Sequence, residues 1–148
     1  MRLVPGSYLT WPVERYPDRP CIVFEGKTFT YRETNVRVNR LANALRQLGL
    51  KTGDVIASLH HNCNQVFESF AANWKMGFIE VSLNARNAAP ENLYVIHQSK
   101  ARALIFEGSF LDQIRSIREE IRNVEFLICH SGRQPHEFID YEEFLANA

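Results

Sequence analysis

The sequence has neither an excess of one charge nor a long apolar run. Lysine plus arginine and aspartate plus glutamate number 17 each, and the basic residues form no tract, so the charge gives no general attraction for nucleic acid or an anionic membrane. The uncharged apolar runs are far too short to cross a bilayer. The N-terminus also lacks the apolar segment of a secretory signal. We therefore expect a cytosolic protein without a transmembrane segment.

Cysteine is scarce, which limits the disulfide bonds that the chain could form. The three cysteines, Cys21, Cys63 and Cys129, are widely separated, and there is no CxxC motif. An odd number at such distances argues against a disulfide framework and fits a reducing compartment. Cys21 and Cys129 lie in the apolar runs "CIVF" and "FLIC", where a cysteine usually acts as a small hydrophobic side chain.

Glycine is present but never clustered. No two of the seven glycines lie within three residues of each other, and neither GxGxxG nor GxxxxGK[ST] occurs, so no phosphate-binding loop is expected. The pair Gly49 and Gly53 in "LGLKTGD" is better explained by the end of a helix. No serine has the GxSxG surroundings of a nucleophile elbow.

The start of the chain predicts a helix, a hairpin and a longer helix. Residues 6–20 hold an apolar helix-like segment, and "CIVFEGKTFTY" indicates two short strands around a tight turn at Glu25-Gly26-Lys27. Thr30 and Glu33 form a capping box. The helix that follows has one apolar face and ends at Gly49. Its predicted buried residues are Val38, Leu41, Ala42, Leu45 and Leu48.

From residue 55 onward, short apolar strands alternate with amphipathic helices. This alternation predicts parallel strands joined by helical crossovers. The chain, at 148 residues, is therefore expected to be one α/β domain over residues 1–148, with a doubly wound or three-layer sheet and a small N-terminal β hairpin. The expected strands are 55–60, 78–83, 102–106 and 124–129. The expected helices are 64–76, 90–99, 109–121 and a last one after 140.

Three of these helices carry further expectations. In 64–76 we expect the stripe Val66, Phe67, Phe70, Ala71 and Trp74 to be core. The helix 109–121 should begin at a Ser109 cap, with "RSIREEIR" as its solvated face. Asp140 with Glu143 should cap the last helix.

The segment "HHNCN" at residues 60–64 is the main site candidate. It follows a strand, and the carboxyl ends of parallel strands are where α/β folds place ligands. His60, His61 and Cys63 are possible metal ligands, with Cys129, His130 and His136 as further donors at distances that the sequence leaves open. Cys63 beside two histidines is also a faint nucleophile pattern. We favour a polar loop with Asn62 or Asn64 as the helix cap, and expect no catalytic, cofactor-binding or metal-binding residue.

Several fragments taken together resemble a known family. They are "YPDRP", "FTYRE", "NRLANALRQLGLKTGDVIA", "NQVFESFAANWKMGFIEVSLNAR", "ENLYVIHQSKARALIF" and "IDYEEFLA". Their order and spacing resemble the N-terminal region of AMP-forming acyl-CoA synthetases, of the adenylate-forming superfamily that includes luciferases and peptide-synthetase adenylation domains. The resemblance runs from about Tyr16 to the end of the chain.

The resemblance implies the first part of the large domain of a ligase. Such enzymes join a carboxylate, here expected to be a fatty or aromatic acid, to ATP and then to CoA, with Mg²⁺. Their ATP contacts come from a Ser/Thr/Gly-rich loop, later aromatic and acidic motifs and a lysine near the C-terminus, none of which occurs here. The chain alone should therefore be inactive, bind none of these cofactors and have the missing C-terminal part as its partner.

One segment departs from the family pattern. Phe78, Glu80 and Val81 stand where the family usually has a proline and small residues, whereas "LNAR" at 83–86 is retained. This departure leaves the carboxylate class open, and no role is carried over for Asn84 or Arg86.

Two other classes stay open beside the ligase fragment. One is a natural short, non-catalytic α/β module that binds a partner or an acyl ligand. The other is a small metal or redox protein that uses "HHNCN". A ligase fragment should expose apolar surface and form homo-oligomers through it, whereas a natural short protein should not.

Overall fold

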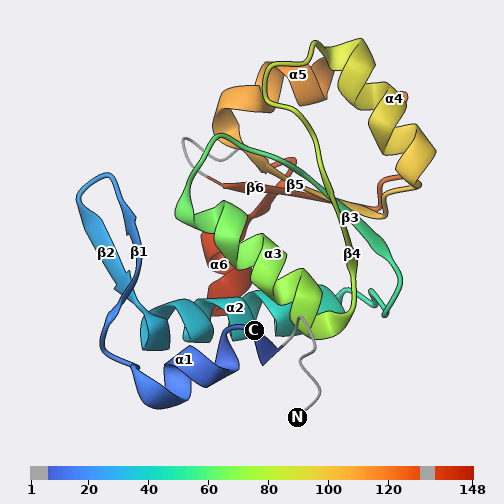
Figure 1. Ribbon diagram of the computed structural model, residues 1–148. Helices are drawn as coiled ribbons and strands as arrows, with labels where there is room; N and C mark the ends of the chain where they lie inside the picture. The colour runs from blue at the N-terminus through green and yellow to red at the C-terminus, as the bar shows by residue number, and fades with distance from the viewer. Residues whose placement is uncertain (1–6, 131–135) are drawn as a thin grey trace.

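The computed structural model describes residues 7–130 and 136–148 as a parallel sheet with helices on both faces and a projecting hairpin (Figure 1). The elements are α1 (Thr10–Arg15), β1 (Pro20–Phe24), β2 (Lys27–Thr30), α2 (Tyr31–Gln47), β3 (Val55–Leu59), α3 (Asn64–Met76), β4 (Ile79–Ser82), α4 (Ala89–Ser99), β5 (Ala103–Glu107), η2 (Gly108–Phe110), α5 (Leu111–Ser116), β6 (Phe126–His130), β7 (Ile139–Asp140) and α6 (Tyr141–Ala146).

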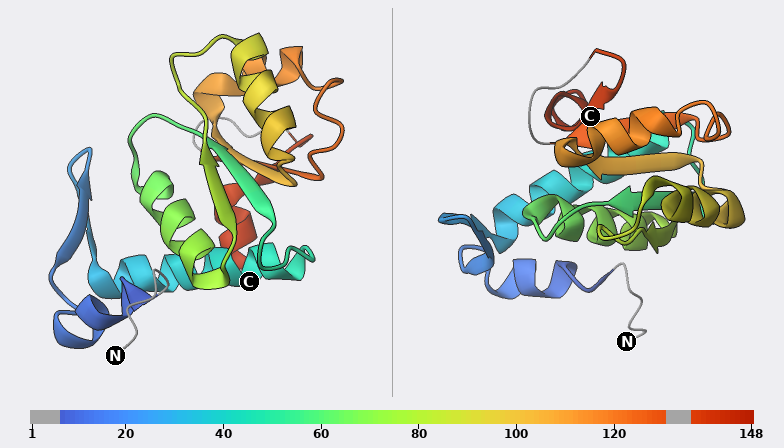
Figure 2. Two further views of the ribbon diagram at one scale, coloured as in Figure 1. Left: turned by 45° about the vertical axis from the view of Figure 1, so that its right-hand side comes forward. Right: turned by 90° about the horizontal axis from the view of Figure 1, so that it is seen from above.

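The main sheet has the strand order β4-β3-β5-β6-β7, and every neighbouring pair is parallel. Helices α2, α3 and α6 pack on one face, and α4 and α5 cover the other, as the two buried clusters and the views in Figure 2 show. The predicted three-layer α/β architecture is confirmed. The short strand β7 was missed, because a two-residue strand carries no periodic pattern of its own.

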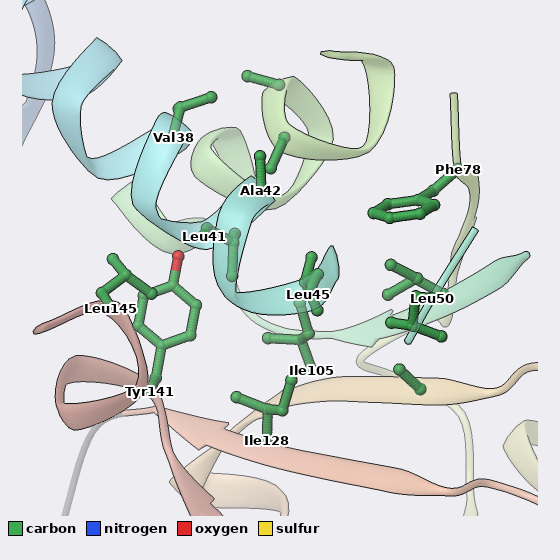
Figure 3. Packing of buried hydrophobic residues seen from close by; sticks show 14 of the residues in the cluster. Val38, Leu41, Ala42, Leu45, Leu50, Phe78, Ile105, Ile128, Tyr141 and Leu145 are labelled. Atoms are coloured by element: carbon green, nitrogen blue, oxygen red, sulfur yellow. The ribbon is translucent and has the colours of Figure 1, made fainter. Parts of the chain in front are cut away.

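Alternation along the strands divides the core into two clusters. Ile56, Ile105 and Ile128 face α2, α3 and α6, whereas the next residue in each strand lies in the other cluster. Figure 3 shows α2 against the first cluster, with Leu41 and Leu45 directed to the sheet and Tyr141 of α6 beside them. Leu41 and Leu45 are fully buried, which confirms the predicted inner face of this helix.

The predicted turns and caps around α2 are also confirmed. Strands β1 and β2 pair antiparallel across Glu25 and Gly26, both of which have positive φ, as a tight two-residue hairpin requires. The Thr30 hydroxyl accepts a hydrogen bond from the Glu33 N–H, and the Glu33 carboxylate accepts one from the Thr30 N–H. Gly49 follows the helix with φ +87°.

The helix predicted over 109–121 is wrong in length. Only α5 is helical, after the 3₁₀ turn η2, and the chain from Ile117 to Asn123 runs in turns. Amides of Arg118 and Glu120 bond to carbonyls three residues back, which tightens the chain out of the α-helix. Ser109 does not cap a helix, because its hydroxyl donates to Glu107. Ile117 and Ile121 are nevertheless buried as expected.

The stripe of α3 that was predicted as core lies only partly in the core. Trp74 is 43% exposed, and it lines a shallow groove with Val66, Phe67 and Phe70. The buried face of α3 instead carries the polar residues Asn64, Glu68, Ser69 and Asn73 together with Ala71 and Ala72. The predicted core role is therefore confirmed for Ala71, which is buried in the first cluster, and in part for Phe67, which packs against it, but it is wrong for Trp74.

Gly77 ends α3 in a place where a side chain does not fit. Its φ is +71°, and a Cβ there would lie 2.9 Å from Cγ2 of Thr52, which is held because its hydroxyl donates to the Met76 carbonyl. We expect Gly77→Ala to lower the free energy of unfolding by about 2–3 kcal/mol. Gly49→Ala, at φ +87° with nothing within 4 Å, should cost only about 1 kcal/mol. Urea titrations that give equal losses would contradict this.

Candidate functional site

The carboxyl ends of β3, β5 and β6 open onto a cleft of about 850 Å³. The cleft lies between this edge of the sheet and the β1–β2 hairpin, so the predicted placement of "HHNCN" at the strand ends is correct. Its lining residues come from the hairpin, α2, the 61–65 segment, β5, β6 and α6. They are Phe24, Glu25, Lys27, Phe29, Arg37, residues 61–65, Glu107, His130 and Glu142.

Three neighbouring strands bring polar side chains to this edge. Glu107 of β5 is in register with His130 of β6, and His60 follows directly after β3. By the two-residue period of a strand, all three side chains point to the sheet face that α2, α3 and α6 cover. Nδ1 of His60 lies 2.6 Å from Nε2 of His130, and the two rings stack with centroids 4.8 Å apart. One ring nitrogen therefore donates to the other.

Burial keeps this histidine pair neutral. Loss of hydration, and then the repulsion of His130, lower the pKa of His60 to about 3, and burial lowers that of His130 to about 4. Glu107 is half-buried, which opposes its charge, yet hydrogen bonds from the His61 amide and the Ser109 hydroxyl hold its pKa below the usual value. The edge thus combines two neutral imidazoles with one carboxylate.

Cys63 stands at the N-terminus of α3, next to the histidine pair. It is the N-cap residue by backbone geometry, so neither Asn62 nor Asn64 holds that position. The predicted capping role of Asn62 or Asn64 is therefore wrong, and Asn64 instead donates to Glu68 over 2.9 Å. Burial raises the pKa of the Cys63 thiol despite hydrogen bonds from the amides of α3. An activated nucleophile needs the opposite shift, so the Cys/His pattern does not indicate nucleophilic catalysis.

A charged network that reaches the wall of the cleft was not predicted from the sequence. Arg37 of α2 donates to Glu68 over 2.7 and 3.1 Å and to Glu142 of α6 over 2.7 and 2.9 Å. Glu68 is only 1% exposed, and the hydroxyl of Tyr141 also donates to it over 2.8 Å. The hydrogen bond and charge of Arg37 lower the pKa of Glu142. These contacts tie together the three helices of one layer.

The other donors weighed in the sequence do not join this group. Cys129 precedes His130 and faces the opposite side of the sheet, where burial raises its pKa to about 11. His136 is exposed. After β4, the Asn84 side chain accepts a hydrogen bond from the Arg86 amide over 2.9 Å, which shapes the loop, and Arg86 is exposed.

Phe78, Glu80 and Val81, which depart from the family pattern, lie in and next to β4. Polar side chains of β3 and α3 form hydrogen bonds with Glu80. Phe78 is buried in the first cluster. The Glu80 carboxylate accepts hydrogen bonds from Ser58 and Asn73. Burial raises its pKa in spite of these donors. The polar inner face of α3 therefore has a partner in β4.

The four described glycines with positive φ, namely Gly26, Gly49, Gly53 and Gly77, lie in separate helix ends and turns. Successive backbone amides aimed at one anion, as a phosphate loop needs, are therefore not provided by them.

The architecture places the chain in a class: a three-layer α/β unit with a five-stranded parallel sheet and an N-terminal hairpin. Residues 9–143 match the AMP-binding enzyme family, and the chain belongs to this family. The resemblance seen in the sequence fragments is thereby confirmed.

Curated relatives are CoA ligases of much greater length. A long-chain-fatty-acid–CoA ligase of Thermus thermophilus is 30% identical over 116 residues, which is 78% of this chain and 21% of the relative. A crotonobetaine/carnitine–CoA ligase of Salmonella paratyphi B is 29% identical over 124 residues, or 80% of this chain and 24% of the relative. The chain thus spans between a fifth and a quarter of these relatives.

Solved structures share the fold. The anthranilate CoA ligase AuaEII, in complex with anthranoyl-AMP, superposes with a TM-score of 0.94 at 22% identity, over 98% of this chain and 28% of that one. A benzoate CoA ligase from Burkholderia xenovorans superposes with a TM-score of 0.85 at 22% identity, over 99% of this chain and 29% of that one.

Among the described residues, no helix combines the length and apolar character needed to cross a membrane.

Proposed function

We propose that this chain is the N-terminal scaffold of an AMP-forming acyl-CoA ligase and has no ligase activity alone. The observation that carries the proposal is the family match over residues 9–143 in a chain that spans only 21–24% of its curated relatives. Adenylation depends on positioned phosphate and metal contacts. The described glycines provide no phosphate loop, so ATP, Mg²⁺ and CoA belong to the longer enzyme.

The exposed apolar residues fit a unit that packs against more protein. Tyr8, Trp11 and Trp74 are 71%, 49% and 43% exposed. With Phe67, the first two line an open pocket of about 660 Å³, and Tyr8 contacts the edge of Trp74. A large aromatic surface of this kind marks an interface. We propose that the rest of the ligase covers it, and that the isolated chain self-associates through it.

A fatty or aromatic acid is the proposed substrate of the whole enzyme. The named relatives act on a long-chain fatty acid or on crotonobetaine and carnitine, and the fold neighbours on anthranilate or benzoate. A cytosolic location is part of the proposal and rests on the three free thiols.

The proposal is tested by pyrophosphate release. The pure chain is incubated with ATP, Mg²⁺, CoA and a panel of fatty and aromatic acids, with a complete fatty-acid–CoA ligase as the positive control. We expect no acid-dependent pyrophosphate above the rate without protein, because the phosphate contacts are missing. Release that depends on an added acid would overturn the scaffold proposal.

Sequencing the gene past codon 148 separates the scaffold proposal from the alternative, a short non-catalytic binding module. The scaffold proposal predicts an open frame that leads into a Thr/Ser/Gly-rich loop with a lysine. Co-expression with that continuation should then relieve the self-association of the chain. A stop codon at this point, together with a well-behaved monomer, would favour the binding module.

A further inference from the structure

His60, Cys63 and His130 converge at the edge of the sheet from two separate segments, the stretch between β3 and α3 and the end of β6. One ligand atom from each of these residues lies within 4.8 Å of the other two. We propose that these three side chains bind a single transition-metal ion of the Zn²⁺ class, with a fourth position open to the cleft. This site is independent of the proposed ligase function, which involves other residues and other ligands.

The donor set and spacing suit such an ion. Imidazole nitrogen and thiolate sulfur are the preferred Zn²⁺ ligands, at about 2.0–2.1 Å for nitrogen and about 2.3 Å for sulfur. Around a tetrahedral ion, two imidazole nitrogens lie about 3.3 Å apart. The present 2.6 Å between His60 and His130 therefore has to open by less than an ångström. His60 follows the last residue of β3, so its ring can shift without breaking the sheet ladder.

The hydrogen bond between the two rings leaves one buried nitrogen unsatisfied. Nδ1 of His60 contacts His130, but Nε2 of His60 is buried and has no hydrogen-bond partner. Either tautomer of His60 thus buries an unpaired donor or an unpaired acceptor, which is unfavourable. An ion bound through Nδ1 takes the place of the proton shared with His130 and fixes the ring proton of His60 on Nε2, which remains a buried donor.

The surroundings favour a cation with an accessible fourth position. The Glu107 carboxylate, in register with His130, contributes negative charge beside the two imidazoles. The Cys63 thiol loses its proton to solvent when it binds the ion. Cys63 and His130 both line the cleft, which gives the ion an entry path and leaves room for a water as the fourth ligand.

The test uses the 148-residue chain, freed of metal by a chelator and titrated with Co²⁺ and with Zn²⁺. We expect one ion per chain, and with Co²⁺ a near-ultraviolet thiolate-to-cobalt charge-transfer band. Cys63→Ser should abolish the band and weaken Zn²⁺ binding about ten-fold or more. His60→Asn should weaken Zn²⁺ binding similarly and keep the band at saturating Co²⁺.

Matched controls are available elsewhere in the chain. Cys21→Ser removes another half-buried thiol, and His136→Asn removes an exposed imidazole; both should keep the affinity and the band. Absence of the band from the unmodified chain at millimolar Co²⁺ would overturn the proposal without any variant. Unchanged Zn²⁺ affinity in folded Cys63→Ser, judged by circular dichroism, would overturn it too.

Discussion

Glu68→Ala is expected to lower the free energy of unfolding by about 3–5 kcal/mol. The substitution removes a buried carboxylate that accepts hydrogen bonds from Arg37, Asn64 and Tyr141. The Arg37 guanidinium then loses one of its two carboxylate partners, and the Tyr141 hydroxyl, which is fully buried, loses its acceptor. Urea unfolding followed by circular dichroism gives the loss directly.

Glu142 provides the control within the same network. It also binds Arg37, but its side chain is 57% exposed, so solvent screens the pair. Glu142→Ala should therefore cost no more than about 1 kcal/mol. Double-mutant cycles with Arg37→Ala should give a larger coupling energy for Glu68 than for Glu142. Equal coupling energies would show that burial does not set the strength of these pairs.

Leu45→Ala should destabilise the protein by about 2–5 kcal/mol. Leu45 is fully buried on the side of α2 that faces the sheet (Figure 3), and its truncation leaves a cavity that packed neighbours fill only in part. Thermal or urea unfolding measures the loss. Asn43→Ala, on the exposed side of the same helix, should change stability by no more than about 0.5 kcal/mol. A loss below 1 kcal/mol for Leu45→Ala would contradict this account of the core.

The elements best predicted from sequence are those whose signals are local. The capping box, the spacing of Val38, Leu41 and Leu45 and the glycine that follows are all contained in one segment, and each is confirmed. In contrast, the helix expected to reach residue 121 ends at Ser116. Ile117 and Ile121 have the right spacing and are buried, but spacing alone does not tell a helix from successive tight turns that bury the same side.

The inner face of α3 shows where local pattern is misleading. Hydrophobicity predicts the side with Phe70 and Trp74 as core, yet the side with Glu68 and Asn73 is buried. These polar side chains can be buried because residues outside α3 form hydrogen bonds with them. Arg37 donates to Glu68, and Asn73 donates to Glu80. Those partners lie on other elements, so periodicity along one helix cannot reveal them.

Only part of the candidate metal site could be predicted from the sequence. His60, His61 and Cys63 follow a strand, and the rule for parallel sheets places them at a ligand-binding edge. The nitrogen that meets His60 belongs to His130, 70 residues further along the chain. That contact requires β6 to lie next to β5 in the sheet. Local sequence patterns do not predict the order of the strands.

The Arg37 network also has a consequence for folding during synthesis. Arg37 and Glu142 are 105 residues apart in sequence, and Tyr141 completes the core from the same late helix. During synthesis the layer formed by α2 and α3 therefore stays incomplete until α6 has left the ribosome, since contacts of such separation form only after the intervening chain exists. Until then Glu68 lacks its hydrogen bond from Tyr141, and the incomplete layer leaves apolar surface that proteases and chaperones can reach.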